Sequence, residues 1–173
     1  MLEMKNYKLF QSKYIIDNQH EFIDQCMEIQ TILNRSDTTE SYRTYNIFSI
    51  TAGSIYFYNL FKELRDIVRT ELPDGPLWMQ AWVNLHDENN VLDWHNHHWP
   101  YHGYISIDPK HTDTEFDSYS IQNKIGQIYF GPGDRLHRVR VISPYVGKRI
   151  TIGYDITNDP VMHTGCLGLI PLL

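Results

Sequence analysis

Two histidines separated by one residue are the side chains of this sequence best suited to chemistry. His95 and His97 flank Asn96, and on an extended backbone this spacing places both imidazoles on the same face. A third histidine, His137, follows the turn Gly-Pro-Gly-Asp at 131–134. Neutral imidazole binds Fe, Zn, Cu or Ni, so the three histidines form a candidate metal site. The alternative interpretation is a polar, solvated loop.

A second candidate group lies twelve positions after His137. Arg149 can hold a carboxylate through two parallel hydrogen bonds, and the hydroxyl of Thr151 lies on the same face of an extended strand. The alternative is an ordinary surface arginine on an edge strand.

The pattern of apolar residues predicts two helices before these groups and strands around them. A helical stripe covers 18–33, where Asp17 or Asn18 can cap the start, and a second one runs from the N-cap Ser54 to Leu72, before Pro73. The polar segment 35–45 is expected to be a surface loop. Short segments rich in Trp, Tyr, Ile and Val then alternate with turns, which predicts strands at 77–85, 101–107, 118–121, 127–130, 137–142 and 149–156. This spacing favours a β-barrel or a double-sheet jelly roll with helices on one outer face.

Composition narrows the class of protein. The 173 residues suit a single domain, and 15 Lys plus Arg against 21 Asp plus Glu give a net charge of -6, which makes nucleic acid an unlikely partner. Neither a membrane span nor a secretory signal is recognisable, so we expect a cytoplasmic protein. Cys26 and Cys166 lie far apart and indicate neither a disulfide framework nor a zinc ribbon. The apolar segment 166–173 is expected to pack along the body or against a second subunit, which would allow a homodimer.

Several segments together resemble the Fe(II)- and 2-oxoglutarate-dependent oxygenases. These are the His-x-His segment, His-Gly-Tyr-Ile-Ser-Ile-Asp at 102–108, Gly-Gln-Ile-Tyr-Phe-Gly-Pro-Gly-Asp-x-x-His-Arg-Val at 126–139, and Arg-Ile-Thr-Ile-Gly-Tyr-Asp-Ile at 149–156. The sequence is most similar to a small single-domain branch encoded by phages and marine bacteria, which would place the protein in the host cytoplasm if it is phage-encoded. The resemblance covers about 78–156 and implies a mainly β, cupin-like fold, the double-stranded β-helix or jelly roll. It also implies His137 as the distal metal ligand, and Arg149 with Thr151 on the far carboxylate of 2-oxoglutarate.

One position departs from the family pattern. The family ordinarily has His-x-Asp or His-x-Glu where this sequence has His-Asn-His, so the usual carboxylate ligand is missing. Either His95, His97 and His137 form a three-histidine site, or Asp93 replaces the carboxylate, because it shares a face with His95. We favour the three histidines, since the similar branch carries His-x-His here.

Neighbouring side chains are expected to complete the cavity. Alternation along 101–107 places His102, Tyr104 and Ser106 on one face. If this face is interior, Tyr104 or Ser106 could donate to 2-oxoglutarate, and His102 could shape the substrate side; ordinary hydrogen-bonded strand residues are the alternative. Trp82 and Asn84 could line the same cavity. His98 has the opposite parity to His97, which indicates a supporting or exposed residue rather than a ligand.

The sequence therefore predicts one domain, with a helical part at 1–76 packed on the sheet, a double-stranded β-helix at 77–157 and a tail at 158–173. Its expected activity is that of a dioxygenase that uses Fe(II), 2-oxoglutarate and O2, hydroxylates a small-molecule or protein substrate and releases succinate and CO2. A cupin-like three-histidine metalloprotein that does not use 2-oxoglutarate, and a non-catalytic phage jelly-roll binding module, are the alternatives. No residue names the substrate.

Overall fold

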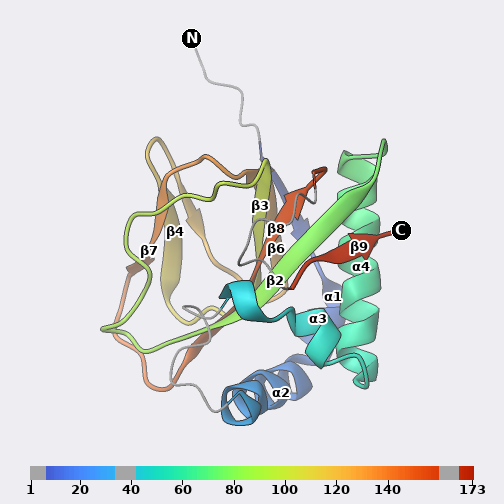
Figure 1. Ribbon diagram of the computed structural model, residues 1–173. Coiled ribbons are helices and arrows are strands. Elements are labelled where there is room, and N and C mark those ends of the chain that lie inside the picture. The colour runs from blue at the N-terminus through green and yellow to red at the C-terminus, as the bar shows by residue number, and fades with distance from the viewer. Residues whose placement is uncertain (1–6, 34–41, 160–167) are drawn as a thin grey trace.

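Two antiparallel sheets face each other in the computed structural model, which describes residues 7–33, 42–159 and 168–173 (Figure 1). The larger sheet has the strand order β1-β6-β3-β8-β2-β9 and the smaller one β5-β4-β7. The strands are β1 (Lys8–Gln11), β2 (Leu77–His86), β3 (Tyr101–Asp108), β4 (Thr112–Phe116), β5 (Ser120–Gln122), β6 (Gln127–Pro132), β7 (His137–Val141), β8 (Arg149–Thr157) and β9 (Ile170–Leu172).

The helices cover the outer face of the larger sheet, on the side away from β4 and β7 (Figure 1). They are α1 (Lys13–Asp17), α2 (Gln19–Ile32), α3 (Ile47–Ile50) and α4 (Ile55–Glu71), with a 3-10 turn at Tyr42–Thr44. Ser54 caps α4 as predicted, because its hydroxyl accepts a hydrogen bond from the Phe57 amide at 3.4 Å. In the described residues, no helix has the length and apolar character that a membrane crossing requires.

The two faces of strand β8 carry different kinds of residue. All its residues are buried, but Ile150, Ile152, Tyr154 and Ile156 belong to the core shared with the helices. The alternate residues lie on the opposite face, toward the smaller sheet, and Arg149, Thr151 and Gly153 line a cavity there. The same strand therefore supports the core with one face and the candidate site with the other.

The strands at 77–85, 101–107, 127–130, 137–142 and 149–156 agree with the sequence to within a few residues, and so do both long helices. Strand β5 begins two residues later than expected, and β1 and β4 were not predicted. In β4, buried Thr112, Thr114 and Phe116 alternate with the partly buried Asp113 and Glu115, so two of the three buried residues are polar and the hydrophobic alternation is weak. Strand β9, in the C-terminal tail, pairs with β2, whereas 160–167 and most of the predicted loop at 35–45 lie outside the described residues.

Asn18 stands at the start of α2 but does not cap it through its side chain. The side-chain Nδ2 of Asn18 instead donates to the Tyr14 carbonyl at 2.8 Å, so Asn18 caps the C-terminal end of the short helix α1.

A glycine in the centre of the larger sheet allows close packing beneath the cavity. A β-carbon at Gly103 would overlap the ring of Tyr154, whose hydroxyl donates to the Tyr129 carbonyl at 2.7 Å across the strand.

We therefore expect Gly103→Ala to lower the free energy of unfolding by about 1–3 kcal/mol, because the strand or the tyrosine must shift. Urea denaturation of Gly53→Ala provides the control, since a β-carbon there meets no atom within 4 Å and should change stability by less than about 0.5 kcal/mol. Equal stability of the two variants would contradict this packing argument.

Candidate metal and anion site

Backbone hydrogen bonds join the segment that carries His95 to strand β7. The His95 amide donates to the His137 carbonyl and the His137 amide to the His95 carbonyl, both at 2.9 Å. The amide of His97 donates to the Gly133 carbonyl at 2.8 Å, and Gly133 packs so closely on the Trp99 carbonyl that a side chain would not fit. The His-Asn-His segment is thus not part of a long strand, but its position against β7 is fixed.

Each of the three imidazoles has an acceptor at Nδ1. His95 Nδ1 lies 2.7 Å from the Asp93 carbonyl oxygen, and His137 Nδ1 lies 2.9 Å from that of Arg135. His97 Nδ1 lies 3.0 Å from the carboxylate of Asp155. Because a carbonyl and an ionised carboxylate only accept, the proton sits on each Nδ1 and the lone pair on each Nε2.

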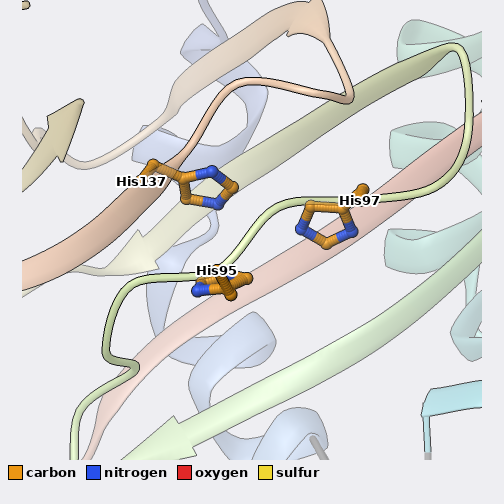
Figure 2. Close-up of side chains that lie close together, drawn as sticks. All are labelled: His95, His97 and His137. Atoms are coloured by element: carbon orange, nitrogen blue, oxygen red, sulfur yellow. The ribbon is translucent and has the colours of Figure 1, made fainter. Parts of the chain in front are cut away.

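The three histidines converge (Figure 2). One nitrogen from each of His95, His97 and His137 lies within 4.8 Å of the other two, and His97 Nε2 is buried without a hydrogen-bond partner. A buried unpaired acceptor is costly, and three imidazoles with free lone pairs are a suitable donor set for a transition metal. The residues present therefore fit a metal ion.

Burial favours the neutral form of His95, His102 and His137. It lowers the pKa of His137 to about 2 and that of His102 to about 4, with further lowering by neighbouring histidines, and it also lowers the pKa of His95. Burial would raise the pKa of Asp155, but hydrogen bonds from His102 and His97 outweigh this effect and lower it. At neutral pH, His95 and His137 are thus in the protonation state that binds metal.

A buried cation stands at the other end of the cavity. Arg149 is 3% exposed, and no carboxylate in the described part of the chain lies within 4.0 Å of it. Its Nε donates to Thr112 Oγ1 and its Nη1 to Thr151 Oγ1, both at 3.3 Å, which leaves three of its five N–H groups without a protein acceptor there. Burial lowers the pKa of Arg149 to about 10, so the guanidinium stays charged at neutral pH.

Two hydroxyls next to Arg149 are free to donate. Thr151 Oγ1 accepts from Arg149 and from Asn84 Nδ2 at 3.3 Å, so its own proton has no protein acceptor in the described residues. The Tyr104 hydroxyl is buried and lacks a partner with hydrogen-bond geometry. Burial raises the pKa of Tyr104 well above its ordinary value, and the nearby Thr114 offsets this only in part, so the phenol remains a donor. These donors and Arg149 suit an anion.

One cavity contains both ends. Its empty volume is about 370 Å³, which includes some open solvent, and the larger sheet contributes one wall while β4 and β7 contribute the other. The indole of Trp82 lines the cavity and occupies the space that a side chain at Gly153 would need. The same ring stacks on His97, with ring centroids 5.8 Å apart. The lining residues are Trp82, Asn84, Leu92, His95, His97, His102, Tyr104, Thr114, His137, Val139, Arg149, Thr151 and Gly153.

The structure separates the sequence-based candidates. It brings the three histidines together and leaves Asp93 outside their cluster, because this exposed carboxylate accepts from the Trp94 amide at 2.7 Å. His98 is exposed, and Ser106 is buried but absent from the cavity lining. Sequence reasoning missed Asp155, although alternation along β8 places it on the face of Arg149 and Thr151.

The low pKa values predict the pH dependence of the metal-free protein. Between pH 6.5 and about 4, unfolded chains bind protons at His102 and His137 that the folded state excludes, so stability falls as pH falls. Each histidine should contribute a slope of up to about 1.4 kcal/mol per pH unit in this window. Urea denaturation at several pH values measures the slope, and His102→Gln should make it shallower. A slope that His102→Gln leaves unchanged would contradict the assignment.

Comparison with known proteins supports the architecture. No protein-family model and no curated protein sequence matches this chain. The solved structures with a similar fold include the non-heme alpha ketoglutarate dependent epimerase SnoN from nogalamycin biosynthesis, with a TM-score of 0.57 and 10% identity over 88% of this chain and 76% of that one. A second SnoN structure, in complex with Fe3+, alpha ketoglutarate and nogalamycin RO, has a TM-score of 0.59 and 9% identity over 97% of this chain and 94% of that one. The protein therefore has the predicted fold, a mainly antiparallel, cupin-like jelly roll consistent with a double-stranded β-helix.

Proposed function

We propose that the protein is a non-haem Fe(II)- and 2-oxoglutarate-dependent dioxygenase of the small branch that its motifs resemble. The observation that carries this proposal is a single cavity with three imidazoles at one end and a buried arginine, without a carboxylate partner in the described residues, at the other. The fold supports it, because SnoN has the same architecture and was solved with Fe3+ and alpha ketoglutarate.

The roles of the residues follow from their chemistry. His95, His97 and His137 would hold the metal through Nε2, and three protein ligands leave positions for a chelating co-substrate and O2. Arg149, Thr151 and Tyr104 would bind the far carboxylate of 2-oxoglutarate through charge-assisted hydrogen bonds. Bound Fe(II) would supply the oxidative decarboxylation of 2-oxoglutarate to succinate and CO2, coupled to hydroxylation of the substrate.

We also propose that the enzyme is a single domain that acts in the cytoplasm. Its substrate would be a small molecule or a protein side chain, because the net charge of -6 disfavours the phosphate backbone of a nucleic acid as a partner. A homodimer through the C-terminal tail is compatible with this proposal.

An anaerobic titration tests the function directly. Fe(II)-loaded protein should develop a weak visible charge-transfer band on addition of 2-oxoglutarate and should release succinate when O2 is admitted. Metal binding without the band would favour the cupin-like metalloprotein, and absence of metal binding would favour the binding module.

The metal ligands can be tested by substitution. We expect His137→Ala to abolish Fe(II) binding, because it removes one of three ligands, whereas His98→Ala, which changes an exposed neighbour of the cluster, should leave it unchanged. Equilibrium dialysis with metal analysis measures both. Equal metal content in the two variants would exclude His137 as a ligand.

The anion site has its own test. Arg149→Gln should weaken 2-oxoglutarate binding about 10- to 100-fold, since it removes a buried charge-assisted contact, and should leave metal binding in place. Arg140→Gln removes an exposed arginine paired with Asp113 and is the matched control. Calorimetric titration of the metal-loaded variants measures the affinities, and parental affinity in Arg149→Gln would overturn the assignment.

A further inference from the structure

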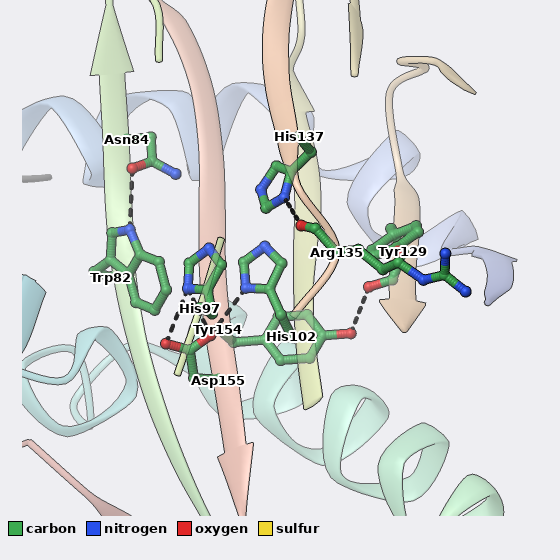
Figure 3. A network of polar contacts seen from close by, with 9 residues as sticks. All are labelled: Trp82, Asn84, His97, His102, Tyr129, Arg135, His137, Tyr154 and Asp155. Atoms are coloured by element: carbon green, nitrogen blue, oxygen red, sulfur yellow. Dashed lines mark hydrogen bonds and ion pairs between the residues drawn. The ribbon is translucent and has the colours of Figure 1, made fainter. Parts of the chain in front are cut away.

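One buried carboxylate lies behind the histidine cluster. Asp155 is 2% exposed, and its two carboxylate oxygens accept from different imidazoles: Oδ1 from His102 Nδ1 at 2.9 Å and Oδ2 from His97 Nδ1 at 3.3 Å (Figure 3). Among the described residues, the ion-pair partners of Asp155 are these two histidines, with no lysine or arginine. A buried carboxylate that serves two imidazoles and no cation needs an explanation beyond ordinary charge pairing.

The strand register explains how the two imidazoles meet at Asp155. His102 on β3 stands directly opposite Asp155 on β8, so their side chains are neighbours on the cavity face. His97 enters from the segment before β3 and stacks on His102, with ring centroids 3.6 Å apart and ring planes 12° apart. Trp82 packs on the other two as a third ring, 5.8 Å from His97 and 6.3 Å from His102.

This contact fixes where the protons of the two rings are. An ionised carboxylate only accepts, so both rings must carry hydrogen on Nδ1 and a lone pair on Nε2. For His97, the lone pair is the buried, unpaired Nε2 described above. An imidazole with hydrogen on Nε2 could not bind a metal through that atom.

His102 is the fourth imidazole of the cavity. In the proposed function, His95, His97 and His137 would hold the metal. The Nδ1 of His102 instead lies 2.9 Å from Asp155 Oδ1, and this contact gives His102 a supporting role.

We propose that Asp155 is a positioning residue that holds His97 as the Nδ1–H tautomer and supplies, one imidazole away from the metal, the negative charge that His-x-Asp sites carry on the metal itself. The inference rests on the proposed metal site. It accounts for a ligand set of three neutral side chains in a cavity whose lining contains no carboxylate.

The substitution Asp155→Asn separates this role from simple space filling. The amide has nearly the same shape but offers one acceptor oxygen to two Nδ1–H donors, so the other donor meets an NH2 group. Transfer of a proton to Nε2 relieves this conflict and removes a lone pair. We expect Zn(II) affinity, measured by competition with a chromophoric chelator, to fall about 10- to 100-fold.

Two control variants define the comparison. Asp93→Asn removes an exposed carboxylate next to His95 and should change Zn(II) affinity by less than about fivefold. His102→Gln keeps an N–H donor for Asp155 and tests the role of His102: Zn(II) affinity within about fivefold of the parent would bear out its supporting role, and a larger loss would overturn it. A folded Asp155→Asn variant, judged by circular dichroism, with parental Zn(II) affinity would overturn the proposal.

The tautomers of His97 and His102 can be measured directly in the parent protein. Nitrogen-15 NMR of the metal-free protein near neutral pH should show His97 and His102 protonated on Nδ1, and hydrogen on Nε2 of His97 would overturn the proposal. The outcome for the oxygenase is separate: Zn(II) binding that depends on Asp155, without any binding of 2-oxoglutarate, would support the role of Asp155 and reject the proposed function. A parent that binds no Zn(II) would overturn both.

Discussion

The burial of polar side chains between two sheets is the constraint on which this structure depends. Every residue of β8 is buried, yet alternate residues are charged, hydroxylated or lack a side chain. Such groups are stable in the interior only if each finds a partner or a ligand. Asp155 finds two imidazoles, and Arg149, which lines the cavity, finds two threonines. The chemistry of the cavity thus follows from how these groups satisfy their hydrogen bonds.

Close backbone contacts fix the positions of the histidines in the cavity. The mutual backbone hydrogen bonds between His95 and His137 fix two of the three proposed ligands relative to each other. The carbonyls of Asp93 and Arg135 then orient their rings. Three imidazoles on flexible loops would lose much more conformational freedom on binding a metal, so this arrangement reduces the entropic cost of coordination.

Much of this could be predicted from the sequence, because the signals were periodic or local. The helical stripe of α4, its cap at Ser54 and the apolar face of β8 are patterns within one segment. The spacing of His95, His97, His137 and Arg149 left a polar loop and a surface arginine open, and their expected roles came from the resemblance to the oxygenases. Strand β4 was not predicted because two of its three buried residues are threonines, which give only a weak hydrophobic alternation. Asp155 escaped because its importance lies in the pairing of β3 with β8, and the contact with His97 spans 58 positions of the chain.

Strands β2, β3 and β8 contact the helices with one face and line the cavity with the other, and this arrangement bears on how far sequences with this fold can differ. The apolar face and the helices form one contiguous core, whereas the cavity face carries the polar residues of the site beside a smaller aromatic cluster. A core of this kind tolerates many changes as long as volume and pattern are kept. Sequences can therefore differ widely while the architecture is preserved. A fold shared at 9% and 10% identity is the result expected from that tolerance.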